Sequence, residues 1–191
     1  MRTRRSVITE TSILWRRLDT PGHDACRLEI HDDGWWIAGT AVFLEERGPA
    51  RLTYHIACDR AWRTQQGEVC GWLGTQSLKF SIVMTCEGVS TLNGLAVPGL
   101  ANCMDLVFGF TPATNLLQLR RMALAEGQAA DVPVAWLDAS TGTLQDLPQR
   151  YERRAVTEYW NEAPTFDYAA LLEVSPTGFI LRYPGLWEAE H

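Results

Sequence analysis

The residues of this chain that could do chemistry are histidines, cysteines and carboxylates, and their densest group is His55, Cys58 and Asp59. A thiol beside an imidazole could act as a nucleophile. Residues 51–59 alternate between apolar and polar side chains, which predicts a strand. In a strand His55 and Asp59 share one face and Cys58 points to the other, so a direct Cys58–His55 pair is not expected.

Metal binding has equally little support in the sequence. The group His31, Asp32 and Asp33 could hold a cation, but Gly34 follows it between two apolar runs, a pattern typical of a tight hairpin turn. We expect neither a metal nor a cofactor. The histidines are scattered and show no paired metal-binding spacing: they are His23, His31, His55 and His191.

Hydrolysis would need an activated serine or a pair of converging carboxylates. The chain has no G-x-S-x-G segment to present a serine. Asp59, Asp105 and Glu158 could serve as acid and base only if the fold brought them to one sugar pocket. A small hydrolase or isomerase that acts on a sugar or lipid is therefore the second hypothesis for the function.

The cysteines are expected to be reduced, buried thiols. Their odd number and the lack of any C-x-x-C pair disfavour both a disulfide framework and a zinc site. The five positions are Cys26, Cys58, Cys70, Cys86 and Cys103.

The composition is that of a globular protein, since 46% of the 191 residues are hydrophobic and 21% are charged. No linker divides residues 1–191, so we expect a single domain. The net charge of -6 argues against nucleic acid as a partner. Because no signal peptide and no 18-residue apolar run are present, we expect a cytoplasmic protein without a membrane span. The basic residues Arg2, Arg4 and Arg5 are interpreted as a solvated tail.

Most of the chain reads as short strands separated by glycine and proline turns. The clearest hairpin joins residues 26–30 to residues 35–44 through the turn at Asp33 and Gly34. Gly67, Gly74, Gly88 and Gly94 are taken as further turns. The remaining strands are expected over residues 12–18, 51–59, 62–66, 68–72, 77–85, 89–95, 132–137, 149–160, 166–174 and 179–183.

A single helix is expected after Thr111 and Pro112, which together form a helix start signal. The apolar residues of the segment recur at helical spacing, and Gly127 is available as a stop. Two alternatives remain open for its end: the helix could continue to Ala125, or it could stop near Gln118 and leave residues 119–125 as a strand.

The paired arginines of this segment diverge in either case. Arg120 falls within the apolar arc of the helix and needs a partner, for which Asp105 is the favoured carboxylate. Arg121 lies at the edge of the arc.

A dozen or more sequential antiparallel strands must curl into a barrel, a roll or a split sheet, because a flat sheet of that size would leave its core side and its edges exposed. The sequence therefore predicts a mostly β protein whose curved sheet encloses one helix.

With this pattern the chain resembles the putative glycolipid-binding proteins of bacteria, whose fold is described as a spiral β-roll. The resemblance implies a many-stranded, largely antiparallel sheet wrapped around a single α-helix, a homodimer and a lipid-like ligand. At Gln118 the family often has a proline. The motifs that carry the resemblance are Tyr54-His55-Ile56-Ala57-Cys58-Asp59, Trp62-Arg63-Thr64, Asp105-Leu106-Val107-Phe108, Thr111-Pro112-Ala113-Thr114-Asn115, Arg120-Arg121 and Tyr183-Pro184-Gly185-Leu186-Trp187.

Binding of a glycolipid or another lipid-like ligand, without catalysis, is the first hypothesis. Aromatic rings can stack on sugars and arginine can hold anionic headgroups, so Arg121→Ala is expected to weaken an anionic ligand. Trp35 and Trp36 must face opposite sides of a strand, so at most one of them can line a given cavity. A third hypothesis makes the aromatic surface a dimer interface only. The candidate ligand-binding residues are Trp36, Tyr54, Trp62, Arg63, Arg120, Arg121, Tyr159 and Trp187.

Overall fold

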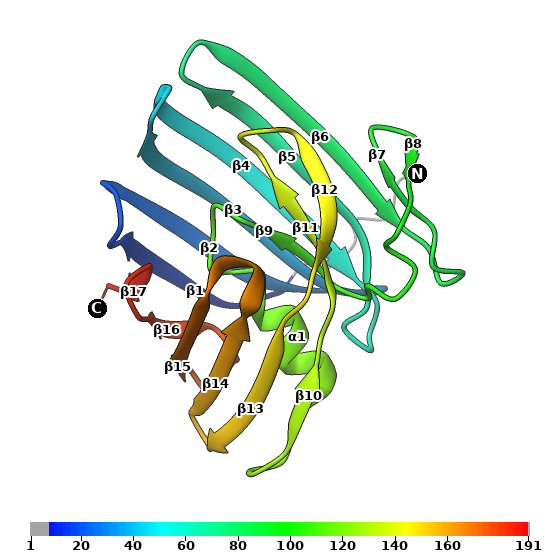
Figure 1. Cartoon of the computed structure of the whole chain (residues 1–191), viewed down its shortest axis with the longest axis vertical. Helices are drawn as coiled ribbons and strands as arrows, with labels where there is room; N and C mark the ends of the chain where they lie inside the picture. The colour runs from blue at the N-terminus through cyan, green and yellow to red at the C-terminus, as the bar shows by residue number, and fades with distance from the viewer. Residues whose placement is uncertain (1–7, 191) are drawn as a thin grey trace.

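Two runs of antiparallel hairpins build one large sheet, as the computed structural model shows for residues 8–190 (Figure 1). The prediction of a mostly β fold is confirmed. The interpretations of Arg2, Arg4, Arg5 and His191 concern positions outside the described residues.

The first run is a meander of eight strands, each paired with the next one along the chain. Its strands are β1 (Ile8–Arg17), β2 (Gly22–His31), β3 (Gly34–Glu45), β4 (Gly48–Cys58), β5 (Thr64–Leu73), β6 (Gln76–Met84), β7 (Ser90–Leu92) and β8 (Leu95–Val97).

The second run returns to the first and completes a 14-stranded sheet within the described residues. The last strand pairs antiparallel with β1, with Trp15 opposite Ala189 and Arg17 opposite Trp187. At the free end of the second run, the strand of residues 129–131 has a single partner among the described strands, the strand of residues 150–155. The strands, in sheet order, are β10 (Ala129–Asp131), β13 (Arg150–Ala155), β14 (Glu158–Ala163), β15 (Tyr168–Val174), β16 (Ile180–Tyr183) and β17 (Trp187–Ala189), with a short 3-10 helix, η1 (Pro164–Phe166), before β15.

A small second sheet and the helix α1 (Asn115–Met122) lie within the curve of the large sheet (Figure 1). The small sheet has the order β12 (Thr143–Leu147), β11 (Val134–Asp138) and β9 (Leu106–Phe108), and β9 and β11 run parallel. Phe108 and Leu116 are fully buried where these elements meet the large sheet. The large sheet thus encloses a helix together with three strands, whereas the sequence predicted the helix alone.

The predicted hairpin between β2 and β3 is confirmed. His31 pairs with Gly34, which leaves Asp32 and Asp33 as the two-residue turn. Side chains alternate along these strands as expected, with Leu28 and Ile37 in the core and Arg27 exposed.

Gly67 does not make the turn that was expected of it, because β5 runs through it without a break. A Cβ atom at this position would lie 2.3 Å from the Cδ2 atom of Leu106 on β9. The glycine therefore serves close contact between the two sheets rather than a change of direction. Residues 149–160 were expected to form one strand, but a turn at Val156 and Thr157 divides them into β13 and β14.

The helix ends between the two alternatives left open by the sequence. Its last residue is Met122, and Ala123 follows in the left-handed conformation with φ 46°. At the other end, the Thr111 hydroxyl accepts a 3.0 Å hydrogen bond from the N–H of Ala113, but regular α-helix begins only at Asn115. Residues 112–114 form the tighter turns that lead into it.

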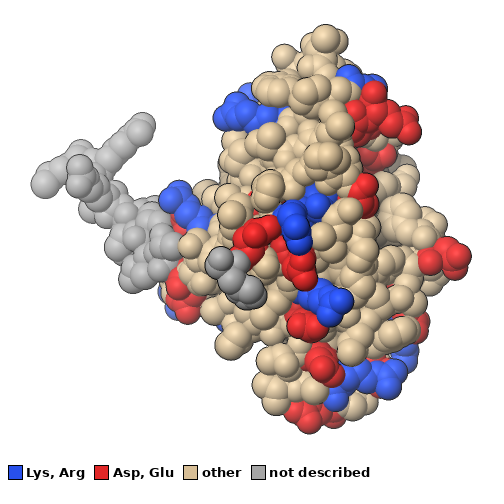
Figure 2. Space-filling view, turned by 90° about the vertical axis from the view of Figure 1, so that its left-hand side faces the viewer, with Lys and Arg blue, Asp and Glu red and all other residues tan. Residues whose placement is uncertain are grey.

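No helix among the described residues has the length and apolarity needed to cross a membrane. Cationic and anionic side chains are interspersed on the face that Figure 2 shows. On the large sheet, Arg16 pairs with Glu188 at 3.0 Å and Arg182 pairs with Glu173 at 3.6 Å. Positive charge at these positions is thus compensated within the chain.

Candidate functional site

A cavity of about 500 Å³ lies beside the first turn of α1, between the small sheet and the strands that join the two runs of the large sheet. Its walls are mainly apolar and aromatic, which is typical of sites for small hydrophobic molecules. The aromatic residues that line it are Phe108, Trp136, Phe166, Tyr168, Tyr183 and Trp187.

These rings are held in place by edge-to-face contacts between separate segments. Trp136 of β11 meets Phe166 of η1 with ring centroids 5.2 Å apart, and Tyr168 of β15 meets Tyr183 of β16 at 5.3 Å. The Tyr168 hydroxyl also donates a 2.9 Å hydrogen bond to the Pro184 carbonyl. Such contacts fix the ring orientations and so give the cavity a defined shape.

Arg17 lies at the border of this cavity, between two aromatic rings. Its guanidinium carbon is 5.0 Å from the ring centroid of Phe43 and 5.4 Å from that of Trp187. The same guanidinium donates two hydrogen bonds to the carboxylate of Asp19, of 2.7 and 2.9 Å. The positive charge is therefore balanced by a neighbouring carboxylate. A smaller cavity of about 190 Å³ shares Arg17 and Trp136 with the larger one.

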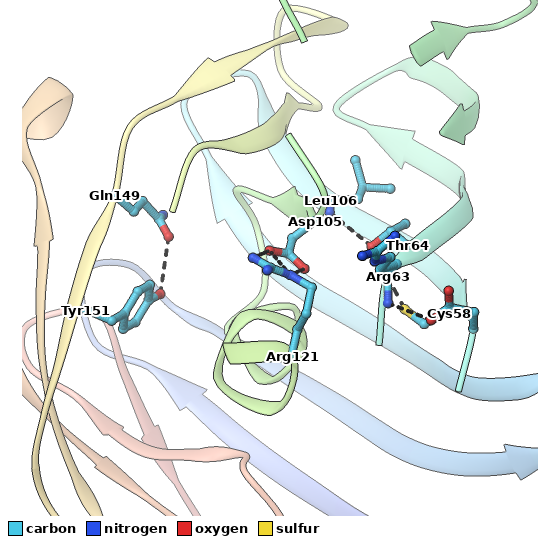
Figure 3. Close-up of polar contacts among 9 residues, drawn as sticks. Cys58, Arg63, Thr64, Asp105, Leu106, Arg121, Gln149 and Tyr151 are labelled. Carbon is cyan, nitrogen blue, oxygen red and sulfur yellow. Dashed lines mark hydrogen bonds and ion pairs between the residues drawn. The ribbon is translucent and has the colours of Figure 1, made fainter. Parts of the chain in front are cut away.

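Amide and phenol groups form what we call the polar floor of the cavity: Asn115, Gln149 and Tyr183 line it, and the fully buried Tyr151 and Asn161 hold them from behind. The Asn115 Nδ2 group donates to the Tyr151 hydroxyl at 2.8 Å. That hydroxyl donates to Gln149 Oε1 at 3.2 Å (Figure 3). Nearby, the Tyr183 hydroxyl donates to Asn161 Oδ1 at 3.2 Å. Burial raises the pKa of Tyr151 well above its ordinary value and that of Tyr183 to about 12. These phenols stay neutral at physiological pH.

At the other end of α1, Arg121 forms an ion pair with the fully buried Asp105 (Figure 3). Its Nε lies 3.0 Å from each carboxylate oxygen, and its Nη2 lies 2.6 Å from Oδ2. Burial raises the pKa of Asp105, and the Arg121 guanidinium opposes this effect. The expected ion pair thus exists, but it is made by Arg121 and not by Arg120, because the helix turns the latter away from Asp105.

Arg120 packs against aromatic rings instead. Its guanidinium carbon lies 5.4 Å from the ring centroid of Trp62, and Trp62 stacks on Trp35 at 4.3 Å. The Nε atom of Arg120 is buried and has no hydrogen-bond partner among the described residues. Tyr159 is close enough for the charges of Arg153 and Arg120 to lower its pKa, although burial raises that pKa more. Of the predicted site residues, Trp62 and Arg120 are therefore in contact, and Tyr159 packs against Arg153.

Tyr54 belongs to a buried network that the sequence did not indicate. Its hydroxyl donates a 2.8 Å hydrogen bond to Oδ2 of Asp24, and the Thr111 hydroxyl donates to the same oxygen. The other oxygen of Asp24 is buried without a partner among the described residues. Burial raises the pKa of Asp24 to about 6, against the effect of these hydroxyl donors. No cation partner is found for this carboxylate in the described part of the chain.

Trp36 lies on the face of the sheet opposite to Tyr54. Its ring is stacked between His31 of β2, at a centroid distance of 4.6 Å, and His55 of β4, at 5.7 Å. Because β2 and β4 flank β3, the two imidazoles cover opposite faces of the indole. Trp35 packs against the core, so the predicted divergence of the two tryptophans is confirmed.

Arg63 lines a different groove of about 660 Å³, together with Cys86 and Cys103. The predicted ligand set therefore divides into several places, and of its members only Trp187 lines the aromatic cavity among the described residues. Arg17, Trp136 and Gln149 line the cavity but were not among the predicted ligand-binding residues. Trp136 could have been found from its place in an expected strand, but nothing local marks Arg17 or Gln149.

The constellations considered for catalysis have other contacts. Asp59 accepts hydrogen bonds from the N–H groups of Ala61 and Arg63 and so shapes its own loop. Cys58 points inward to Thr64, while His55 stacks on Trp36. In the described part of the chain, no three His, Cys, Asp or Glu side chains gather as a metal site.

Comparison with known proteins adds a family and a related structure. The family model described as putative glycolipid-binding matches residues 12–189. The crystal structure of a DUF1089 family protein from Pseudomonas aeruginosa is similar, with 26% sequence identity and a TM-score of 0.78 over 87% of this chain and 91% of that one. No curated protein matches the sequence significantly.

Proposed function

We propose that this chain, which belongs to the putative glycolipid-binding family, binds an amphipathic glycolipid in the aromatic cavity beside α1 and releases it unchanged. The observation that carries the proposal is the cavity itself, whose walls are apolar and aromatic and whose floor presents amides and phenols. An acyl chain would be removed from water by the walls, and the floor would meet a polar headgroup.

The first test is native mass spectrometry of the protein purified from a bacterial host, followed by solvent extraction and analysis of the released lipids. We expect one glycolipid or related amphiphile for each binding site. An apo protein that stays clean after incubation with lipid extracts would contradict the proposal.

A cavity-filling variant tests whether the ligand binds in the aromatic cavity. Ala163 is buried and lines the cavity, so Ala163→Leu should reduce the amount of bound lipid. Ala169 on the adjacent strand β15 is exposed, and Ala169→Leu adds the same side chain outside the cavity. Equal lipid content in these two folded variants would show that the ligand binds elsewhere.

We include a homodimer and a cytoplasmic location in this proposal, as the sequence led us to expect. Multi-angle light scattering would give the mass of the particle in solution, and fractionation of the host cell would give its location. A monomer at micromolar concentration would remove the dimer from the proposal without affecting the cavity.

A further inference from the structure

We infer that the aromatic cavity selects an amphiphile with an uncharged, hydroxyl-bearing headgroup and rejects phosphate and carboxylate headgroups. This inference rests on the proposed function and narrows its ligand. It also differs from the expectation that arginines hold an anionic headgroup.

The first reason is that the positive charges near the cavity are already balanced. Arg17 is the single cation among the described residues that line it, and both its Nε and Nη2 groups donate to Asp19. The guanidinium carbon also lies within 5.4 Å of the ring centroids of both Phe43 and Trp187. The Arg121 guanidinium is likewise held by Asp105. An anionic headgroup would therefore have to compete with a carboxylate already in place.

The second reason is the chemistry of the floor. Gln149 lines the cavity, and its Oε1 accepts from Tyr151, while its Nε2 has no hydrogen-bond partner among the described residues. Asn115 also lines the cavity, and its Nδ2 group donates a hydrogen bond to the Tyr151 hydroxyl. Carboxamides and neutral phenols both donate and accept hydrogen bonds, as a hydroxyl group requires. They supply no net charge to an anion.

The third reason is the presence of a buried acid without a cation partner close behind the cavity wall. Thr111 lines the cavity, and its hydroxyl donates to Asp24. The other oxygen of Asp24 is buried without a hydrogen-bond partner among the described residues. A second negative charge brought to this part of the cavity would be repelled by the Asp24 carboxylate. A sugar or glycerol headgroup avoids this repulsion.

The test compares amphiphiles that share one alkyl chain and differ only in the headgroup. Dodecyl glucoside, 1-dodecylglycerol and dodecyl phosphate are titrated below their micelle concentrations into the full-length protein, and dissociation constants are measured by calorimetry at pH 7.5. We expect the uncharged amphiphiles to bind at least about tenfold more tightly than the phosphate, as loss of one buried hydrogen bond or a like-charge contact would give.

The outcomes separate the inference from the proposed function. Phosphate binding that equals or exceeds glucoside binding would overturn the inference while keeping a lipid site. Failure of all three amphiphiles to bind would overturn the proposed function and the inference with it. Preference for the glucoside over the glycerol compound would assign the headgroup to sugars, and the reverse would assign it to glycerides.

A floor variant connects the preference to its residues. Gln149→Leu removes the free amide, so we expect the affinity for dodecyl glucoside to fall about tenfold, with little change for dodecane-like chains without a headgroup. Gln145→Leu on β12 is the matched control, because Gln145 is exposed. An unchanged glucoside affinity in a folded Gln149→Leu protein would remove the floor from the site. The comparison of headgroups on the natural sequence stands even if this variant does not fold.

Discussion

The buried acids at the two ends of α1 differ in the groups that hold them. At the end where the helix begins, Asp24 is held by the hydroxyls of Tyr54 and Thr111, without a cation partner among the described residues. At the end where it stops, Asp105 is held by the guanidinium of Arg121. The cavity adjoins the first of these ends.

The difference shows that a buried acid in this protein is paired either with a cation or with hydroxyl donors alone. Arg120 and Arg121 stand in the last turn of the helix, where positive charge favours the helix dipole. One of them neutralises an acid and the other packs on an indole. The end whose acid has no cation partner among the described residues retains amides and hydroxyls that can serve a ligand. Four measurements can break or sharpen this contrast.

The largest effect is expected at the ion pair. Arg121→Met leaves Asp105 buried without its cation and should lower the free energy of unfolding by about 3–5 kcal/mol. Urea denaturation measures the loss. Arg121→Lys keeps a positive charge and should lose less, and Asp105→Asn introduced into Arg121→Met should restore part of the stability. A loss within 1 kcal/mol, roughly that of a surface pair, would mean that the pair has little structural weight.

The pH dependence of stability should report Asp24. Its pKa rises from the ordinary 3.8 to about 6 because the carboxyl is buried. The native state therefore holds this proton more tightly than the unfolded state, so its contribution is full below pH 3.8 and is lost as the pH rises through about 6. The loss is on the order of 3 kcal/mol.

Asp24→Asn is the control for this pH dependence, because the amide cannot ionise. The difference in unfolding free energy between the natural protein and this variant should change between pH 3.8 and about pH 6, the interval between the ordinary and the raised pKa. Parallel curves over that range would show that Asp24 does not titrate there.

Thr111→Val tests the hydroxyl that links Asp24 to the start of the helix. The variant keeps the shape but loses the donor to the carboxylate and the acceptor for the N–H of Ala113. We expect a cost of about 1–3 kcal/mol at pH 7 that shrinks at pH 5, where the acid is protonated. Thr111→Ser keeps the hydroxyl and should stay near the natural protein. A cost independent of pH would limit Thr111 to capping.

The smallest effect is expected at Arg120. Its Nε lacks a hydrogen-bond partner among the described residues, and its contact with Trp62 is partly exposed. Arg120→Met retains an unbranched chain over the indole and should change the unfolding free energy by no more than about 1 kcal/mol. A loss as large as that of Arg121→Met would erase the distinction between the paired arginines.

The strand pattern of the fold follows from local sequence, whereas its second sheet does not. The β2–β3 hairpin could be predicted because a polar two-residue turn separates two apolar runs. The parallel pairing of β9 with β11 places Leu106 beside Ala135, which are distant in the sequence. The hydrophobic periodicity of the two segments does not indicate that they pair. Gly67 was misread for the same reason, since its role depends on Leu106 of another sheet.

The site was harder to predict than the fold. Side-chain chemistry singled out tryptophans and arginines, and it correctly separated Trp35 from Trp36 by strand alternation. It could not foresee that two histidines would cover Trp36, because that contact depends on which strands become neighbours. The pairing of Arg17 with Asp19 is local, since the two are neighbours but one along the chain, and the sequence could have suggested it.

The pairing of β17 with β1 has a consequence for synthesis on the ribosome. Among the described strands β1 is made before all those that separate it from β17, so the edge of β1 that pairs with β17 stays open while the intervening strands are made. Contacts between residues as distant as Trp15 and Ala189 close late and favour slow folding. During that interval an exposed strand edge can pair with another nascent chain, so this protein should depend on chaperone capacity during translation more than a helical protein of equal length.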